Sequence, residues 1–362
     1  MGVKLKYIAI ICNYELLEDR VGGMDYFFWA FNEKCAKSSI KIDWFFPNAA
    51  SHGEYRKFNI IASSSGSSLE KCVLKYVKSN NVEYSNIITH FVELCTSFYR
   101  DIKKLQNSQI IAVDHNPRPL EGYSLEKRIK KRVKGMLYSK HINLFIGVSD
   151  YTSHAILIDF GRLLKNKIQT IYNGVLLDDI FPKITERRKL NPKFLVVSHL
   201  RESKGIQDLI IAVNALPDVL KKDLKIDIYG DGPYKSELLK LVKLFSLESV
   251  FDFKGSQSNI NEVYQNYDYL IQPTYMECFS LSILESLAAN IPVITTPVGG
   301  NTEVIVNNKN GFIFEAKDSK SLTKLLDSII RGKKRIKGNT RTIIESRFSI
   351  DIMVKNHLNI LD

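Results

Sequence analysis

The chain has 362 residues, of which 44% are hydrophobic and 25% are charged. This balance is ordinary for a globular protein, and it excludes wholesale disorder, collagen-like repeats and a small domain held by disulfides. Because one hydrophobic core seldom grows beyond about 250–300 residues, the length predicts two domains. Lysine and arginine outnumber aspartate and glutamate by 51 to 39, which gives a net charge of +12.

Cysteine usage and the N-terminal sequence bear on the compartment. The five cysteines are scattered and contain no Cys-x-x-Cys pair, which argues against a disulfide framework or a structural zinc site and favours a reducing environment. The apolar run at residues 7–12 is too short for a signal peptide, and no run reaches the roughly 18 apolar residues of a membrane span. We expect a cytoplasmic protein, with attachment to the inner face of the membrane left open.

Short apolar runs alternate with helical patterns along the whole chain. The candidate strands are residues 7–12, 40–46, 59–62, 86–92, 109–114, 144–148 and 169–172, followed by 193–199, 224–229, 250–253, 269–272 and 291–295. Continuous apolar runs indicate strands that are buried on both faces, as in parallel sheets. The pattern predicts an α/β fold of two Rossmann-like, doubly wound domains facing an interdomain cleft. We expect domains at residues 1–178 and 179–345, and a final helix at 346–362 that packs back toward the first domain.

The segment after the candidate strand 269–272 carries the sharpest pattern. It is expected to fold as a loop containing Glu277, a helix from about Ser280 to Asn290 that contains Glu285, and a further strand. The first N–H groups of a helix have no intrahelical partners, so this helix start is a candidate anion site.

Glu277 and Glu285 are candidates for a shared role in catalysis or binding. Eight residues on one helix correspond to about 12 Å of rise and about 80° of rotation. A retaining glycosidase needs its carboxylates about 5–5.5 Å apart, so a shared acid/base pair does not fit this spacing. Two readings stay open from the spacing alone: solvated charges at a helix end, or carboxylates that bind two hydroxyl-bearing groups.

Other predicted strand ends also fit an anionic ligand. Arg201 and Lys204 follow the strand at 193–199, where they are candidates for binding phosphate or are ordinary surface charges. Gly230 and Gly232 follow the strand at 224–229, where glycine permits either close approach to a ligand or a tight turn.

These motifs, in this order, resemble the C-terminal domain of the GT-B glycosyltransferases of family four, the glycosyl transferases group 1. The resemblance rests on Lys204-Gly205, the run Gly230-Asp231-Gly232-Pro233, Glu277 with Glu285, Pro292-Val293-Ile294 and Gly299-Gly300-x-x-Glu303, and Asn173-Gly174-Val175 also matches the segment between the family's domains. It is strong over residues 193–315, whereas the N-terminal half matches only in outline. It implies a retaining, metal-independent transferase that uses a nucleoside-diphosphate sugar and needs no further cofactor.

The resemblance also implies roles for individual residues. Glu285 would bind the ribose hydroxyls, Glu277 would hold the donor sugar, and Lys204 would neutralise the diphosphate. The backbone of four successive residues would cradle the sugar and the diphosphate: Cys278, Phe279, Ser280 and Leu281. The chain departs from the family at His199, where an arginine is usual, and we expect Arg201 to supply the missing charge.

The N-terminal domain would bind the acceptor. Gly22-Gly23 precedes a helical stretch at residues 26–37, so Gly23 is a candidate for approach to a phosphate or to the acceptor. His115 follows the strand at 109–114. A single histidine is more often a packing or capping residue, but this one matches a family histidine and would contact the donor sugar or orient the acceptor.

A basic segment runs from Lys127 to Lys140, with seven basic residues and no acid. Ile129, Val133 and Met136 share one helical face with Leu137, as in a helix that binds an anionic membrane surface. A helix packed by its apolar face is the alternative. Nucleic acid is not expected, because no aromatic-rich binding motif accompanies the charge.

The resemblance, together with the basic N-terminal half, implies a glycosyltransferase acting on a hydroxyl of a glycan or lipid-linked acceptor, as in bacterial surface polysaccharide assembly. A nucleotide-sugar epimerase and a non-catalytic sugar-binding protein are the alternatives. A dinucleotide dehydrogenase is disfavoured, because Gly22-Gly23 does not supply Gly-x-Gly-x-x-Gly after an early strand.

Overall fold

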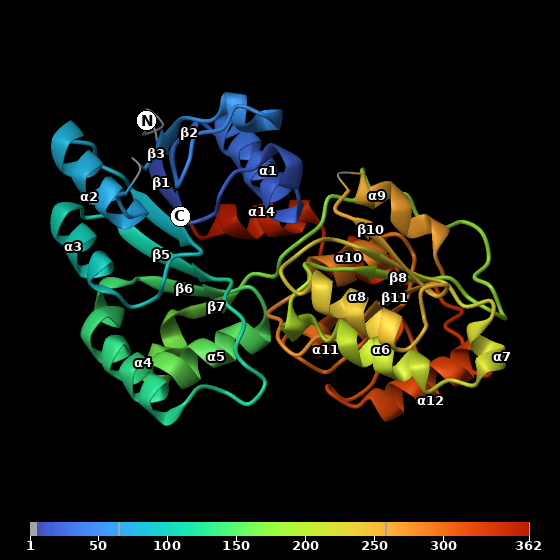
Figure 1. Cartoon of the computed structure of the whole chain (residues 1–362). Helices are drawn as coiled ribbons and strands as arrows, with labels where there is room; N and C mark the ends of the chain where they lie inside the picture. Colours follow the sequence, from blue (N-terminus) through green and yellow to red (C-terminus); the bar gives the residue numbers. More distant parts are fainter. Residues whose placement is uncertain (1–5, 64–65, 258, 362) are drawn as a thin grey trace. The chain divides into compact units, whose positions relative to one another are not determined.

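The computed structural model describes residues 6–63, 66–257 and 259–361, and it divides the chain into two compact units. Unit 1 comprises residues 1–173 and 350–362, and unit 2 comprises residues 174–349 (Figure 1). The division falls after Asn173, whereas the sequence placed it after residue 178. No described helix is long and apolar enough to cross a membrane.

Unit 1 is built on a seven-stranded parallel sheet with the order β3-β2-β1-β4-β5-β6-β7. Its strands are β1 (Lys6–Cys12), β2 (Ile40–Phe46), β3 (Ile60–Ala62), β4 (Asn86–His90), β5 (Gln109–Asp114), β6 (Leu144–Gly147) and β7 (Ile168–Thr170). Its α-helices are α1 (Gly23–Lys37), α2 (Leu69–Asn80), α3 (Ser97–Leu105), α4 (Leu125–Tyr138), α5 (Asp150–Phe160) and α14 (Ile350–Asn359). Short 3-10 helices are η1 (Glu18–Arg20), η2 (Gly53–Lys57), η3 (Ser139–His141) and η4 (Arg162–Lys167).

Helices cover both faces of this sheet. On one face, α2, α3 and α5 bury Val73, Tyr99 and Ile156 against the strands. Elsewhere in unit 1, α14 lies alongside α1, and the His357 ring packs against Phe27 with 4.7 Å between the ring centroids (Figure 1). The last helix of the chain therefore belongs to the first unit.

Unit 2 is built on a six-stranded parallel sheet with the order β10-β9-β8-β11-β12-β13. Its strands are β8 (Phe194–Val197), β9 (Ile226–Tyr229), β10 (Phe251–Gly255), β11 (Tyr269–Gln272), β12 (Val293–Thr295) and β13 (Gly311–Ile313). Its α-helices are α6 (Ile206–Asn214), α7 (Asp218–Lys221), α8 (Lys235–Leu244), α9 (Ile260–Val263), α10 (Leu281–Ala288), α11 (Asn301–Val304), α12 (Ser319–Ile330) and α13 (Thr342–Arg347). The 3-10 helices are η5 (Glu202–Lys204) and η6 (Tyr264–Asn266).

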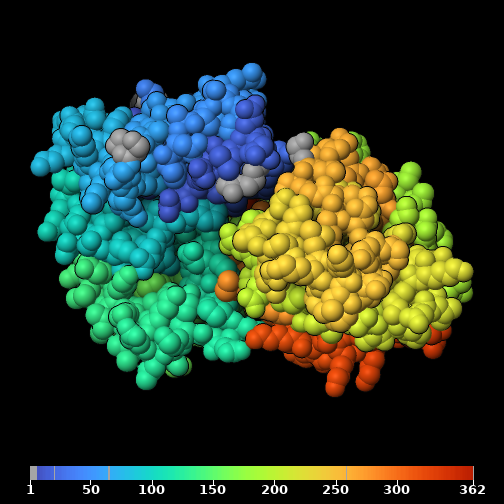
Figure 2. Space-filling view, viewed as in Figure 1, coloured from blue at the N-terminus to red at the C-terminus, as the bar shows by residue number. Residues whose placement is uncertain are grey.

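The hydrophobic core of unit 2 holds its helices against the sheet. Leu209, Leu238 and Leu326, from α6, α8 and α12, are buried in one cluster with the strands. The segment around α8 forms the near surface of unit 2 in yellow (Figure 2).

Strand order reverses between β8 and β11 in unit 2 and between β1 and β4 in unit 1. In sheets of this kind, ligands bind beyond the carboxyl ends of the strands at such a reversal.

Candidate functional site

The loops after β8 and β11 meet at the strand-order reversal of unit 2. Tyr275 donates its backbone N–H to the Ser203 carbonyl oxygen over 2.8 Å, and the Thr274 hydroxyl donates to the same oxygen over 3.3 Å. Gly205, the residue before α6, has φ +69°, and a Cβ there would overlap the Pro273 carbonyl oxygen. A glycine is therefore required where these two loops cross.

Lys204 and Glu277 form an ion pair at this crossing. Lys204 Nζ lies 2.7 Å from Glu277 Oε2, and the side chains are 21% and 12% exposed. The other carboxylate oxygen of Glu277 accepts the backbone N–H of Cys278 over 3.3 Å. Two residues that the sequence nominated separately are thus joined, and the pair places a cation and a carboxylate side by side at the end of the sheet.

The start of α10 lies beyond β11, as the sequence predicted, with Ser280 as the residue before the helix. The Ser280 side chain does not cap the helix, because its hydroxyl accepts Gln272 Nε2 over 2.6 Å. The first-turn N–H groups of α10 therefore have no side-chain cap, which makes this end electropositive. Gln272 Oε1 is buried without a hydrogen-bond partner among the described residues.

Glu285 projects from α10 and is held by Tyr264. The Tyr264 hydroxyl donates to Glu285 Oε2 over 2.8 Å, and Tyr264 itself is fully buried. Burial raises the pKa of Glu285, and the hydrogen bond from Tyr264 opposes that rise. Tyr264 was not identified from the sequence. It lies between two predicted strands, where nothing in the pattern distinguishes it from other aromatic residues.

Gly299 brings a further loop against Glu277. Its φ is +63°, and a Cβ there would overlap the Glu277 carbonyl oxygen. Gly300 donates its N–H to the Cys278 carbonyl oxygen over 2.9 Å, and the Phe279 ring packs on Phe348. The loop from Glu277 to Ser280 is therefore held by contacts with its neighbours in unit 2.

Two of the residues nominated from the sequence, Gly232 and Arg201, lie outside the side-chain contacts of this cluster. Gly232 packs against the backbone of Leu200, which a Cβ would overlap, so glycine is required there for the packing of two loops. Arg201 is exposed, and its side chain forms no ion pair within the described part of the chain. His199, the position of the family arginine, is also exposed.

The strand-order reversal of unit 1 carries the second group of candidate residues. His115, after β5, is 7% exposed, and its Nε2 lies 3.0 Å from His90 Nδ1 at the end of β4. Burial lowers the pKa of His115 to about 3 and that of His90 well below its usual value, so both rings are neutral at pH 7. Because one of the two facing nitrogens must donate, the tautomers of the two rings are coupled. His90 was missed because it was placed inside a strand.

Phe91 stacks on His115 with 4.2 Å between the ring centroids, and its φ is +57°. This conformation is uncommon for a large side chain and concentrates at functional sites. Phe91, Asn13 and Asn116 follow β4, β1 and β5, and all three line a cavity of about 410 Å³. The carboxyl end of the unit 1 sheet is thus hollowed where an acceptor would be expected.

Gly23 is the first residue of α1, and the turn before it is organised by Asp25. The Asp25 carboxylate is fully buried and accepts the Gly22 N–H over 3.0 Å, the Tyr14 hydroxyl over 2.9 Å and the Tyr55 hydroxyl over 2.6 Å. The Gly22-Gly23 turn is therefore held from the interior, and a Cβ at Gly22 would meet nothing within 4 Å.

The two α/β units, each built on a parallel sheet, correspond to the GT-B class of fold. Residues 178–344, which lie almost wholly in unit 2, match the family model of the glycosyl transferases group 1. Among solved structures, Anabaena HepE in complex with UDP and glucose superposes with a TM-score of 0.77 at 18% identity, over 98% of this chain and 99% of that one. Sucrose-phosphate synthase from Thermosynechococcus elongatus gives 0.77 at 16% identity, over 98% of each chain.

Curated relatives match over a shorter stretch. N-acetyl-alpha-D-glucosaminyl L-malate synthase of Bacillus anthracis is 33% identical over 46% of this chain and 46% of its own length. The N-acetylgalactosamine-N,N'-diacetylbacillosaminyl-diphospho-undecaprenol 4-alpha-N-acetylgalactosaminyltransferase of Campylobacter jejuni is 30% identical over 48% of this chain and 49% of its own length. The matched segments thus span about half the length of these relatives.

Proposed function

We propose that the chain is a retaining, metal-independent glycosyltransferase that moves a sugar from a nucleoside-diphosphate sugar to a hydroxyl of a glycan or lipid-linked acceptor. Bacterial surface polysaccharide assembly is the proposed setting. The observation that carries the proposal is the cluster at the strand-order reversal of unit 2, where Lys204, Glu277 and the uncapped start of α10 come together. The match of residues 178–344 to the glycosyl transferases group 1 supports it independently.

The donor half of the proposal follows from charge. Cleavage of the anomeric bond leaves a diphosphate with added negative charge, which Lys204 and the first turn of α10 stabilise electrostatically. Glu277 accepts hydrogen bonds from donor-sugar hydroxyls once the diphosphate competes for Lys204. Tyr264 occupies one oxygen of Glu285, and the ribose hydroxyls bind the other. The backbone from Cys278 to Leu281 surrounds the sugar and the diphosphate.

The acceptor half lies on unit 1. His115 is neutral at pH 7, so it orients a hydroxyl by hydrogen bonding without adding charge. The cavity beside Phe91 and Asn116 takes the acceptor, and Gly23 lets the start of α1 approach it. Attack from the face of the departing diphosphate gives retention. The leaving phosphate oxygen takes the proton of the attacking hydroxyl as the anomeric C–O bond breaks, so we assign no protein base to that step.

Lys204→Ala tests the donor site, with Lys235→Ala as the matched control. Lys235 also forms an ion pair in unit 2, with Asp231 over 3.0 Å, but lies outside the cluster. We expect Lys204→Ala to lower transfer about 100-fold or more, the usual cost of removing one group that stabilises developing charge. Lys235→Ala should retain wild-type transfer. Equal rates in the two variants would contradict the assignment.

A panel of nucleotide sugars separates the remaining alternatives. Free nucleotide that appears only with an acceptor indicates transfer. An isomerised donor without acceptor indicates an epimerase, and binding without nucleotide release indicates a sugar-binding protein. The anomeric configuration of the product, read by nuclear magnetic resonance, tests retention, and activity in the presence of a chelator tests metal independence.

A further inference from the structure

The apolar face of α4 is exposed. From the sequence alone, it was open whether this face packs into the protein or binds a membrane surface. Ile129, Met136 and Leu137 are 55%, 67% and 54% exposed, and Leu125 and Val133 are also exposed. At about 100° per residue, these five side chains span an arc of about 120°. The alternative that this face packs into unit 1 is therefore wrong for the described helix.

α4 is held to unit 1 by a different face. A Cβ at Gly135 would overlap the Phe160 carbonyl oxygen, so the helix backbone lies directly against the end of α5. Lys131 Nζ pairs with Asp159 over 2.9 Å, and Arg132 Nη2 donates to the Ile158 carbonyl oxygen over the same distance. These contacts fix the rotation of α4 and leave its apolar stripe outside.

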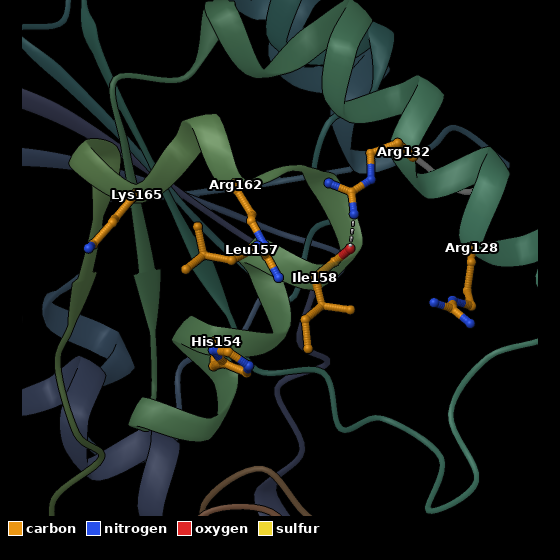
Figure 3. A pocket seen from close by; sticks show the side chains of 7 residues that line it. All are labelled: Arg128, Arg132, His154, Leu157, Ile158, Arg162 and Lys165. Atoms are coloured by element: carbon orange, nitrogen blue, oxygen red, sulfur yellow. Dashed lines mark hydrogen bonds between the residues drawn. The ribbon is translucent and has the colours of Figure 1, made fainter.

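A basic cavity lies between α4 and the corner where α5 passes into η4. Its volume is about 580 Å³, and Figure 3 shows how the side chains of both elements surround it. The lining residues are Arg128, Arg132, His154, Leu157, Ile158, Arg162 and Lys165. The lining thus combines four cations with two aliphatic residues and contains no acid.

The charges in this cavity are not matched by acids. The side chains of Arg128, Arg162 and Lys165 form no ion pair with the residues that the structure describes. On the other side of the same helix, by contrast, Lys130 pairs with Glu126 and Lys134 pairs with Glu93. Unneutralised positive charge is therefore concentrated where the cavity is.

The cavity borders the exposed apolar stripe. On the helical wheel of α4, Arg128 and Arg132 lie beside Leu125 at one edge of the stripe, whereas Lys130 and Lys134 flank the other edge. Ile158, which lines the cavity, is itself 52% exposed. A soluble anion would use the charge alone, and nucleic acid would leave the apolar stripe uncovered. An anionic lipid satisfies both features.

We propose that this cavity binds the phosphate headgroup of an anionic membrane phospholipid while the apolar stripe of α4 lies in the lipid interface. Phosphate oxygens would pair with the forked guanidinium groups of Arg128 and Arg162, and Lys165 would add a third charge. The stripe would bury its side chains at the boundary of the headgroups and acyl chains. The inference deepens the proposed function by naming a lipid surface as a partner of unit 1.

The test is co-flotation of the full chain with phosphatidylcholine vesicles, with and without phosphatidylglycerol. The cavity variant replaces Arg128, Arg162 and Lys165 by glutamine. The matched control replaces three exposed lysines of α2, Lys71, Lys75 and Lys78, by glutamine and so makes the same change in charge.

Each basic residue near an anionic surface contributes about fivefold to partitioning, so we expect the cavity variant to bind phosphatidylglycerol vesicles about 100-fold more weakly. The α2 control should bind as the wild type does. A second variant, Ile129→Ser with Met136→Ser, should also weaken binding while leaving the charge unchanged. Equal losses in the cavity and control variants, or unchanged binding of the serine variant, would overturn the proposal.

Three further arms identify the ligand. Glycerol phosphate should fail to displace the protein from vesicles, because the soluble headgroup lacks acyl chains, and displacement would overturn the assignment to lipid. Equal binding to phosphatidylcholine alone, or tighter binding to duplex DNA than to vesicles, would also overturn it. All arms omit nucleotide sugar, so vesicle binding by a Lys204→Ala protein is expected to be unchanged, and either proposal can fail alone.

Discussion

Arg118→Met should destabilise unit 1 strongly, because Arg118 joins two buried carboxylates. Arg118 Nη2 lies 2.7 Å from Asp114 Oδ2 and 2.9 Å from Asp159 Oδ2, and all three side chains are 8% exposed or less. Burial alone would lower the pKa of Arg118, but the two carboxylates reverse the effect and raise it. Methionine preserves most of the apolar volume and removes the charge.

The loss of stability depends on the ion-pair and hydrogen-bond partners that Asp114 and Asp159 retain without Arg118. Removing one member of a buried ion pair costs about 3–5 kcal/mol, since the other charge is left uncompensated. Asp159 retains Lys131, and Asp114 retains the backbone and side-chain N–H groups of Asn116. The cost should therefore lie near the lower limit, about 3 kcal/mol. For a unit of this size, that corresponds to a fall of about 6–12 °C in melting temperature.

Tryptophan fluorescence reports this transition selectively. Both tryptophans of the chain, Trp29 and Trp44, lie in unit 1. The control is Lys130→Met, which breaks an ion pair whose members are 69% and 75% exposed and should change the free energy of unfolding by less than about 0.5 kcal/mol. If Arg118→Met shifts the melting temperature no more than Lys130→Met does, the reasoning from buried charge is wrong.

Three further predictions concern single groups. Burial lowers the pKa of His357 to about 4, below the value of about 6.5 in the unfolded chain. As the pH falls from about 6.5 toward 4, the unfolded state takes up a proton that the folded state does not, and stability is lost. His357→Leu should flatten that loss, measured by denaturant unfolding across this range. Gly299→Ala should reduce transfer by displacing Glu277, because the added Cβ overlaps its carbonyl oxygen, and the same substitution at Gly22 should be tolerated. Tyr264→Phe removes a hydrogen bond that lowers the pKa of Glu285. As the pH falls, binding of a nucleoside diphosphate should therefore begin to weaken at a higher pH than in the wild type, as calorimetry would show.

Much of the fold could be predicted because parallel strands are continuous apolar runs. Every run identified in the sequence overlaps a strand, and residues 40–46, 109–114 and 269–272 match their strands at both ends. β13 was missed, because three residues at the edge of a sheet carry too little pattern to be distinguished from a loop.

The candidate site was predictable only in part, because spacing along the chain does not report contacts across it. The motifs identified Lys204 and Glu277, but their pairing depends on the crossing of two loops 73 positions apart in sequence. His90 ends its strand as Asp114 ends the next, but the apolar Phe91 and Val92 follow it in the sequence, so the pattern gave no signal that the strand ends there. The partner of Glu285, Tyr264, had none either.

The placement of α14 in unit 1 has a consequence for the way the chain is made. Phe27 and Phe31 on α1 receive their packing partner His357 only when the final helix has been synthesised. Unit 2, an insertion within unit 1, has all of its residues before then. During synthesis on the ribosome, unit 1 begins to emerge before unit 2 but is completed after it. A fragment ending at Asn173 would display uncovered aromatic rings and aggregate, whereas one spanning residues 174–349 would retain a whole core.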